Sequence, residues 1–368
     1  MGKGATRLEA ITRQNELLQE QNDLLREQNA LLQQPSAGSR YGDYGIFIDN
    51  IERDEMRSGI LVTSHRKKLW NVQINLIKEF DRICRKHNLR WFAAGGTLIG
   101  AARHKGFIPW DDDVDVVMLR PEYEKFRRIV ASEIKPPYHL DIWYNYRRED
   151  DEPSDLTDMS LPLISRDYFK KYYPICFPFF PLIKIRDTRT FFLEFVGEST
   201  FNQGIFLDIF PLDVLPPFAE EQQRINFEIA RVIYAATVNP ALIRDAMQKN
   251  QRLLVDYGSL QKFMSLPYKQ RGLQLENLLA KNFFPTERVG DMRDWCIVQK
   301  RRFYHLKAFS DVTYLPFEKI ELPAPVDYDS FLTDFYGDWR KPVFTYTHAR
   351  YYSAEIPWEE YKQKTAFK

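Results

Sequence analysis

Residues 95–118 read GGTLIGAARHKGFIPWDDDVDVVM and combine a diglycine turn, a basic loop and an acidic run in one short segment. Asp113 and Asp115 lie two residues apart, and a strand is expected over residues 114–118. The period of two in a strand places both carboxylates on one face, close enough to share a cation. Oxygen ligands of this kind suit Mg²⁺ or Mn²⁺, which proteins bind through one or two carboxylates together with substrate phosphates. The segment therefore predicts a site for a metal ion and a phosphate.

The diglycine that precedes the acids fits a phosphate cradle. Gly95 and Gly96 allow the backbone to approach a ligand closely. A helix expected to begin after Thr97 would direct its amide donors and its positive dipole end at an anion. The stretch thus offers donors for the phosphate as well as ligands for the metal.

An isolated acid further along the chain would complete this site. Asp208 lies within Phe-Leu-Asp-Ile, residues 206–209, inside a strand expected over residues 205–210. Burying a carboxylate among apolar neighbours is costly unless the group has a partner or a function. Asp208 is therefore expected beside Asp113 and Asp115, and it is the residue best suited to act as the catalytic base.

Several basic and aromatic side chains near these acids have two possible roles. The loop at residues 103–105 is either an ordinary basic surface or a set of cations that neutralises phosphate. Lys184 and Arg186, in an apolar setting, are either partners of buried acids or ligands of the donor phosphate. Trp110 is more typical of a core position than of a base-stacking platform. The residues predicted to bind substrate or phosphate are Gly95, Gly96, Thr97, Arg103, His104, Lys105, Trp110, Asp111, Asp112, Lys184 and Arg186. Those predicted to bind metal and act in catalysis are Asp113, Asp115 and Asp208.

Other interpretations of the acidic run remain open. A solvated acidic turn is the simplest of them. An EF-hand loop would place Asp111, Asp113 and Asp115 at its first, third and fifth positions, but Val116 stands where that loop needs glycine. A glycosyltransferase could hold a nucleotide sugar with the same Asp-x-Asp, although it would not require the upstream diglycine. Two further alternatives are a nucleotidyltransferase that transfers a nucleoside monophosphate and a coiled-coil scaffold with an inactive domain.

The order of the expected elements indicates an α/β fold. Ser64 is expected to cap a helix whose apolar residues recur at three-to-four-residue spacing. A second helix is expected from Pro121 to about Glu133. Strands are expected over residues 89–94 and again before Pro211, where the run of apolar residues ends. Helices and strands therefore alternate along the core.

Five parts follow one another along the chain. They are a coiled-coil helix over residues 1–34, a linker and lead-in over 35–60, a catalytic core over 61–215, a helical subdomain over 216–310 and a C-terminal segment over 311–368 that packs on the core. In the first part, Gln-Asn-x-Leu-Leu recurs every seven residues, starting at Gln14. The repeat places asparagines in the coiled-coil seam, where they define register and oligomer number, so a homo-oligomer is expected. A solvated polar helix, or one packed on its own domain, is the alternative.

The overall composition excludes several classes of protein. The chain has 52 basic and 51 acidic residues, which gives a net charge of +1 and no electrostatic preference for nucleic acid. The three cysteines show no Cys-x-x-Cys spacing, so neither a disulfide framework nor a cysteine zinc site is expected. No apolar run reaches the roughly 18 residues needed to span a bilayer. A cytoplasmic protein is expected, with a peripheral contact at the inner face of the membrane as a further possibility.

The segment resembles the signature of LicD proteins, a branch of the nucleotidyltransferase-fold superfamily that includes fukutin and fukutin-related protein. The resemblance rests on the diglycine, on His-Lys-Gly-Phe-Ile-Pro-Trp at residues 104–110 and on Asp-Asp-Asp-Val-Asp at residues 111–115. Further matching segments occur in order at residues 80–94, 184–188, 204–213 and 326–339. The resemblance covers about residues 60–340.

This resemblance implies an α+β nucleotidyltransferase-like core, a small mixed sheet flanked by helices. It also implies transfer of a phosphorylated alcohol, typically phosphocholine from CDP-choline, to a sugar hydroxyl of a surface glycan or its lipid-linked precursor, with release of CMP. Ribitol phosphate and glycerol phosphate are alternative cargoes. By the family pattern Asp113 and Asp115 bind Mg²⁺ or Mn²⁺ and Asp208 completes the acidic set. Residues 340–352 diverge from the pattern, so His348 receives no role.

Overall fold

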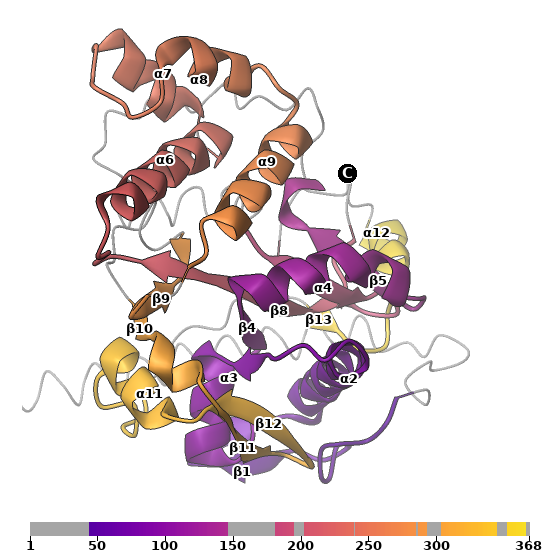
Figure 1. Ribbon diagram of the computed structural model, residues 1–368. Helices are drawn as coiled ribbons and strands as arrows, with labels where there is room; N and C mark the ends of the chain where they lie inside the picture. The colour runs from indigo at the N-terminus through magenta and orange to yellow at the C-terminus, as the bar shows by residue number, and fades with distance from the viewer. Residues whose placement is uncertain are drawn as a thin grey trace, which may run out of the picture.

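The structure is a computed structural model that describes residues 44–145, 181–194, 202–238, 240–284, 286–292, 303–343 and 352–365. It is a mixed α/β fold in which helices pack around a central sheet (Figure 1). The α/β prediction is therefore confirmed. The expected coiled coil over residues 1–34 lies outside the described residues, as does His348, and the expectation of a homo-oligomer stays a prediction.

The central sheet has seven strands and mixed strand directions. They are β3 (Phe92–Ala93), β4 (Asp115–Leu119), β5 (Tyr138–Ile142), β6 (Ile183–Asp187), β8 (Ile205–Leu215), β9 (Arg288–Gly290) and β10 (Tyr304–His305). On one side of β8 lies β4 in parallel orientation, followed by β3. On its other side β6 and then β9 pair in antiparallel orientation with successive halves of β8. Strand β5 in turn pairs with β6, and β10 pairs with β9.

The long strand β8 corrects one expectation. The strand expected to end at Pro211 continues to Leu215. Asp208 donates its backbone N–H to Val114 O at 3.0 Å on the β4 side, so the nitrogen of Pro211, three residues later, faces the opposite side. On that side β6 ends opposite Ile209 and β9 begins opposite Asp213. Proline is tolerated because its missing donor falls in the gap between these two partners.

Nine helices surround the sheet within the described part of the chain. They are α2 (Ser64–Lys86), α3 (Gly95–Ile99), α4 (Arg120–Glu133), α6 (Glu221–Val238), α7 (Pro240–Gln248), α8 (Tyr257–Met264), α9 (Tyr268–Lys281), α11 (Tyr328–Tyr336) and α12 (Trp358–Thr365). Short helical turns occur at Gly100–His104 (π), Trp143–Asn145 and Leu306–Phe309 (both 3₁₀). None of the helices that the structure describes is long and apolar enough to cross a membrane.

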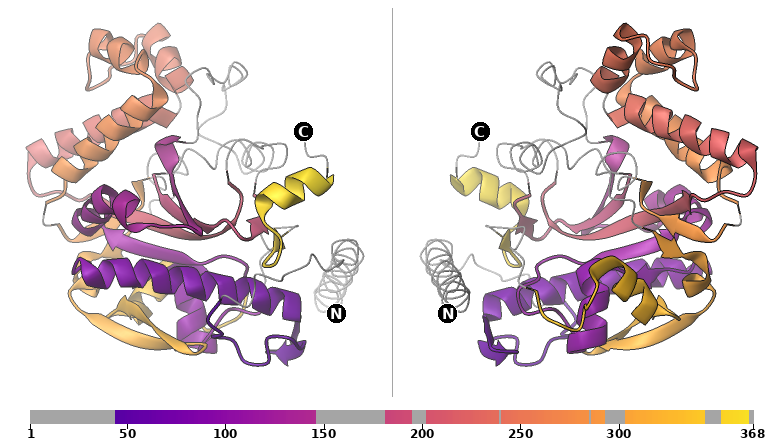
Figure 2. Two further views of the ribbon diagram at one scale, coloured as in Figure 1. Left: turned by 90° about the vertical axis from the view of Figure 1, so that its right-hand side faces the viewer. Right: turned by 90° about the vertical axis from the view of Figure 1, so that its left-hand side faces the viewer.

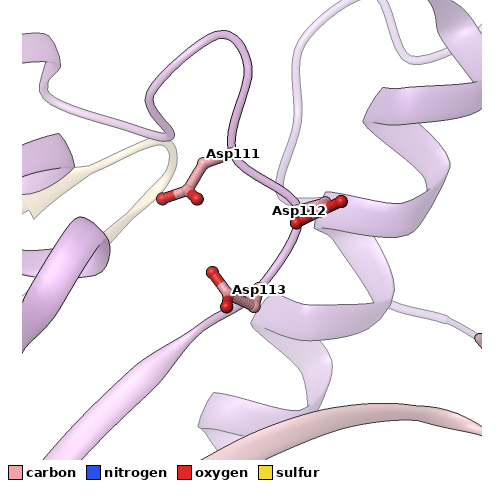
Figure 3. A group of neighbouring side chains, drawn as sticks. All are labelled: Asp111, Asp112 and Asp113. Atoms are coloured by element: carbon pink, nitrogen blue, oxygen red, sulfur yellow. The ribbon is translucent and has the colours of Figure 1, made fainter. Parts of the chain in front are cut away.

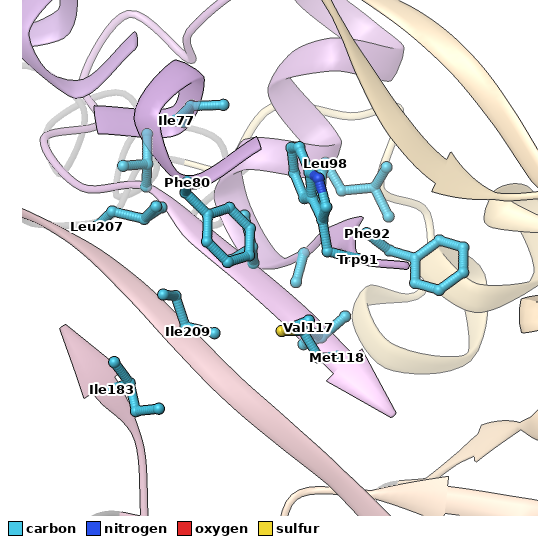
Figure 4. Packing of buried hydrophobic residues seen from close by; sticks show 14 of the residues in the cluster. Ile77, Phe80, Trp91, Phe92, Leu98, Val117, Met118, Ile183, Leu207 and Ile209 are labelled. Carbon is cyan, nitrogen blue, oxygen red and sulfur yellow. The ribbon is translucent and has the colours of Figure 1, made fainter. Parts of the chain in front are cut away.

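The helix expected from Ser64 is confirmed, but its cap is a different residue. Thr63 holds the N-cap position, and its Oγ1 accepts the backbone N–H of Arg66 at 3.2 Å. Figure 4 shows Ile77 and Phe80 of α2 in one apolar cluster with residues of β8. The ring of Phe80 also lies 5.1 Å from that of Phe126 in α4. These contacts fix α2 against both the sheet and α4.

Three two-stranded sheets accompany the main one. They are β1 (Glu55–Arg57) with β2 (Ile60–Val62), β11 (Val312–Phe317) with β12 (Ile320–Pro325), and β7 (Phe191–Phe192) with β13 (Tyr352–Ser353). The last pair joins the C-terminal segment to the core, and β12 packs close to β3. The segment over 311–368 thus contains regular elements that contact the core.

Helices α6 to α9 gather into a lobe beside the sheet, visible at the top of Figure 1 and in both views of Figure 2. The segment over 216–310 is not wholly helical, because it also supplies β9 and β10 to the main sheet. A buried ion pair joins the lobe to the core: Arg120, at the start of α4, contacts Asp213 of β8 and Glu276 of α9.

The contact between α2 and the C-terminal segment predicts a pH dependence of stability. His65 stacks on Tyr352 with 4.5 Å between ring centroids, and burial together with the charge of Arg66 lowers its pKa to about 4. An unfolded chain, in which histidine has a pKa of about 6.5, binds more protons between pH 6.5 and 4 than the folded protein. The stability of the fold should therefore fall as the pH falls through this window. His65→Phe keeps an aromatic ring without the titration, so its Tm should fall less than that of wild type between pH 7 and 5. Parallel Tm curves for the two proteins would contradict this expectation.

Candidate active site

The diglycine begins a helix rather than preceding one. The expected helix start after Thr97 is wrong, because α3 runs from Gly95 and continues into the π-helical turn at 100–104. Gly95 has a φ of 54°, a left-handed conformation that glycine adopts without the steric cost of a side chain. Thr97 lies in the first turn, and its Oγ1 accepts the backbone N–H of Asp115 at 2.9 Å. The start of α3 is therefore bonded directly to the start of β4.

Both glycines lie against carboxylates of the acidic run. A Cβ atom on Gly95 would lie 2.7 Å from Oδ2 of Asp115, and one on Gly96 would lie 2.3 Å from Oδ2 of Asp111. Both distances are shorter than van der Waals contact. The two glycines therefore allow the acids to approach the backbone of α3, which is the close approach expected from the sequence.

The predicted metal ligands Asp113 and Asp115 lie at the N-terminal end of β4. The strand starts at Asp115, so Asp113 precedes it rather than lying in it. Burial still alternates: Asp111, Asp113 and Asp115 are half-buried, whereas the residues between them are buried. This alternation places the three carboxylates on one side of the chain.

Asp208 lies on the neighbouring strand, directly opposite Asp115. The two residues are register partners in the parallel pair β4 and β8. Since side chains of register partners extend from the same face of a sheet, their carboxylates share one face. Leu207 and Ile209 belong to the core that includes α2, and Asp208 alternates with them, so the acid faces away from that helix. The expected adjacency of Asp208 to the acidic segment is thus present.

Three consecutive acids have carboxylates close enough to hold one ion. One oxygen from each of Asp111, Asp112 and Asp113 lies within 4.8 Å of the others, and the described residues offer no further such group of three. Figure 3 shows Asp111 and Asp113 turned toward the same space, whereas Asp112 turns to the adjacent helix. Asp112 is fully buried. The half-buried carboxylates of Asp111 and Asp113, which face the same space, are hard oxygen donors of the kind that Mg²⁺ or Mn²⁺ binds.

Asp208 is paired with a buried lysine. Lys184 of β6 is its register partner, and Nζ lies 2.8 Å and 3.1 Å from the two carboxylate oxygens. The same Nζ lies 2.8 Å from Oε1 of Glu194. Burial raises the pKa of Asp208 to about 6, although the charge of Lys184 opposes the shift. Burial therefore makes this carboxyl group more basic than an ordinary aspartate, as a proton acceptor needs to be.

Arg186 lies two residues further along β6 and is fully buried. Its guanidinium contacts Asp141 and donates to Oε2 of Glu194 at 2.6 Å and to the carbonyl of Gly204 at 3.1 Å. Arg186 and Lys184 thus share Glu194, an acid that the sequence interpretation did not identify. Glu194 lies just after the short strand β7, where no sequence pattern indicates that it belongs to the site.

The basic loop contacts the C-terminal segment. Arg103 donates from Nη1 to the carbonyl of Trp339 at 2.6 Å and to that of Lys341 at 3.3 Å, and from Nε to Nε2 of His104 at 2.9 Å. Burial and the neighbouring Arg103 lower the pKa of His104 to about 4, so its ring is neutral at pH 7. Lys105 is exposed, with a φ of 55°.

Trp110 lies against this loop. Its indole is buried, with 9% of its surface exposed, and packs edge-on at 6.3 Å from the ring of His104. This is a core environment, the commoner role expected for such a tryptophan.

The backbone of the acidic run is held by α2. Arg66 and Trp70 donate to the carbonyl of Asp111 at 2.8 Å and 2.9 Å, and Gln73 donates to that of Asp112 at 2.7 Å. These three residues had no place in the predicted site. The sequence does show that Gln73 is a polar residue on the apolar face of a helix. That position does not reveal which group Gln73 binds.

The site lies within a region that resembles a known family of proteins. The family model described as LicD/FKTN/FKRP, nucleotidyltransferase domain, matches residues 88–216. That range contains the diglycine, the acidic run, Lys184 and Asp208. The resemblance to the LicD family inferred from the sequence is therefore confirmed.

Individual relatives extend the match. The lipopolysaccharide cholinephosphotransferase LicD of Haemophilus influenzae is 24% identical over 277 residues, which cover 73% of this chain and 89% of that protein. Uncharacterised proteins of Rickettsia typhi and Rickettsia prowazekii are 36% and 34% identical over 57 residues, which cover 16% of this chain and 18% and 21% of theirs.

Proposed function

We propose that this protein transfers a phosphorylated alcohol, phosphocholine from CDP-choline in the first instance, to a sugar hydroxyl of a surface glycan or its precursor and releases CMP. The observation that carries the proposal is the convergence of the diglycine, the half-buried acids of the acidic run and Asp208 at one edge of the sheet. The similarity to a lipopolysaccharide cholinephosphotransferase over most of both chains supports the choice of cargo and acceptor.

The acids form the cation-binding part of the site. We propose Asp113, Asp115 and Asp208 as ligands of Mg²⁺ or Mn²⁺. Their carboxylates do not form one group within 4.8 Å, so binding of the ion would draw them together, and Asp111, whose carboxylate lies close to that of Asp113, would join them. When bound, such an ion neutralises charge on the phosphates of the donor. The start of α3 at Gly95 and Gly96 leaves backbone free of side-chain bulk beside these carboxylates, so a pyrophosphate can approach amide donors there.

The reaction is a substitution at phosphorus. The acceptor hydroxyl oxygen attacks the phosphorus that carries choline, a new oxygen–phosphorus bond forms, and the bond from that phosphorus to the oxygen of CMP breaks. Asp208 takes the hydroxyl proton, because its carboxylate shares a face of the sheet with that of Asp115 and burial makes it more basic than an ordinary aspartate. Lys184 holds the orientation of Asp208 through contacts to both of its oxygens.

Purified full-length protein tests this proposal with CDP-choline, Mg²⁺ and an oligosaccharide or lipid-linked acceptor. We expect CMP release and an acceptor heavier by one phosphocholine, both stopped by EDTA. Release of CMP and free phosphocholine without acceptor gain would indicate a hydrolase. Nucleotide on the acceptor would indicate a nucleotidyltransferase, and reaction of a nucleotide sugar would indicate a glycosyltransferase. If only CDP-ribitol or CDP-glycerol is turned over, the proposed reaction stands and only the identity of the transferred alcohol changes.

A further inference from the structure

The acidic run has to hold several repelling carboxylates in fixed positions, yet its backbone lies outside regular structure. Residues 111–114 belong to no helix or strand. A loop of this kind keeps a defined geometry only if other parts of the fold bind its backbone groups. We propose that Arg66, Trp70 and Gln73 of α2 are positioning residues that orient the carboxylates of the acidic run for cation binding. The inference rests on the metal site of the proposed function.

The three donors lie on one face of α2. Their spacing of four and then three residues aligns them along the helix. Arg66 and Trp70 converge on a single acceptor, the carbonyl oxygen of Asp111, and Gln73 reaches the next carbonyl in the chain, that of Asp112. Trp70 and Gln73 are fully buried. Water therefore cannot replace these bonds without opening the core.

The donors are themselves held in place. The indole of Trp70 stacks on Phe107 at 4.7 Å with the rings nearly parallel, and the guanidinium of Arg57 lies 5.3 Å from its centroid. The guanidinium of Arg66 lies 5.8 Å from the ring of Tyr352. Side chains fixed in this way present their N–H groups at a constant position.

Asp111 is consequently fixed at two points. Its carbonyl is bound by α2, and its carboxylate lies against Gly96 at the start of α3. Asp112 adds a second bond to α2 through its carbonyl, and its side chain turns to the adjacent helix (Figure 3). With both peptide carbonyls directed at α2, the side chains of Asp111 and Asp113 are left facing the same space. The backbone contacts thus set the orientation of these ligands.

The test is the affinity of the full-length protein for Mn²⁺, measured by electron paramagnetic resonance of the free ion. Gln73→Leu removes the donor to Asp112, together with a side-chain oxygen that is buried without a hydrogen-bond partner. Trp70→Phe keeps an aromatic ring against Phe107 but removes the indole N–H that donates to Asp111, together with part of the ring volume. Loss of a residue that orients metal ligands typically weakens metal binding by about 10- to 100-fold, so each variant should raise the Kd for Mn²⁺ by at least about 10-fold.

Asn71→Leu is the matched control. Asn71 is a fully buried amide on the same helix, but it donates to the carbonyl of Gly45 at 2.9 Å, in a different loop. Its loss should reduce stability and leave the Kd for Mn²⁺ within about twofold of wild type. Unchanged Kd values in Gln73→Leu and Trp70→Phe would overturn the inference, and so would equal weakening in all three variants.

The outcomes also separate this inference from the proposed function. Weakened Mn²⁺ binding in the two α2 variants, with CDP-choline inert in the wild-type protein, would support the positioning role and reject the donor. Active wild-type protein whose Gln73→Leu variant binds Mn²⁺ normally would reject the positioning role alone. Absence of saturable Mn²⁺ binding in the wild-type protein would reject both.

Discussion

Replacing Asp115 with asparagine should lower phosphotransfer by about 1000-fold, or ~4 kcal/mol of transition-state stabilisation, while the fold survives. The substitution keeps the size of the side chain, so the contact with Gly95 is preserved. It removes one negative charge where the site needs a charged oxygen ligand. Asp113→Asn should have a similar effect for the same reason. The measurement is CMP release at saturating Mg²⁺, with circular dichroism to compare the folds.

Asp245→Asn is a suitable control, because that acid lies on α7 in the helical lobe and pairs with Lys249 at the surface. It should retain wild-type turnover. Near-wild-type activity in Asp115→Asn and Asp113→Asn, measured on folded protein with Mg²⁺, would show that neither acid is a ligand. Recovery of either variant at high Mn²⁺ would instead indicate that the ligand is weakened and that the site is correctly placed.

The part of the site that the sequence predicted is the part controlled by local rules. The period of two placed Asp113 and Asp115 on one side, and the structure retains that alternation even though β4 begins only at Asp115. An acid isolated among apolar residues pointed to Asp208, which the fold places opposite Asp115. In both cases the side-chain type and its spacing carried the information.

Contacts that join distant segments to backbone groups could not be predicted in this way. Gln73 is 39 residues from the carbonyl that it binds, and a carbonyl has no residue type to reveal it. Arg103 likewise donates to carbonyls more than 200 residues away. Glu194 gains its role only because β6 brings Lys184 and Arg186 beside it.

The limits of β8 were missed for a related reason. Proline usually ends a strand because it lacks a donor. At Pro211 that donor would face the space between β6 and β9, so its loss removes no ladder bond. Only the strand order reveals this gap, and strand order depends on segments that are far apart in the sequence.

The second large effect is expected on stability, at the ion pair that joins the helical lobe to the core. Arg120 is fully buried; it donates to both carboxylate oxygens of Asp213, at 2.6 Å and 2.7 Å, and also contacts Glu276. Glu276 is fully buried as well and accepts the indole N–H of Trp143 at 2.6 Å. A single guanidinium therefore balances two carboxylates that have no access to water.

Arg120→Met should accordingly lower the free energy of unfolding by about 3–5 kcal/mol, because it leaves both carboxylates buried without their cation. Arg128→Met, on an exposed position of α4 with a 3.7 Å pair to Glu124, should change it by less than about 1 kcal/mol. Urea unfolding of the two variants measures the difference. A third variant, in which Arg120→Met is combined with Asp213→Leu and Glu276→Leu, should recover part of the loss, because the apolar replacements remove the uncompensated charges. Equal stabilities for Arg120→Met and Arg128→Met would mean that water reaches these carboxylates, and that the lobe is held to the sheet by apolar contacts alone.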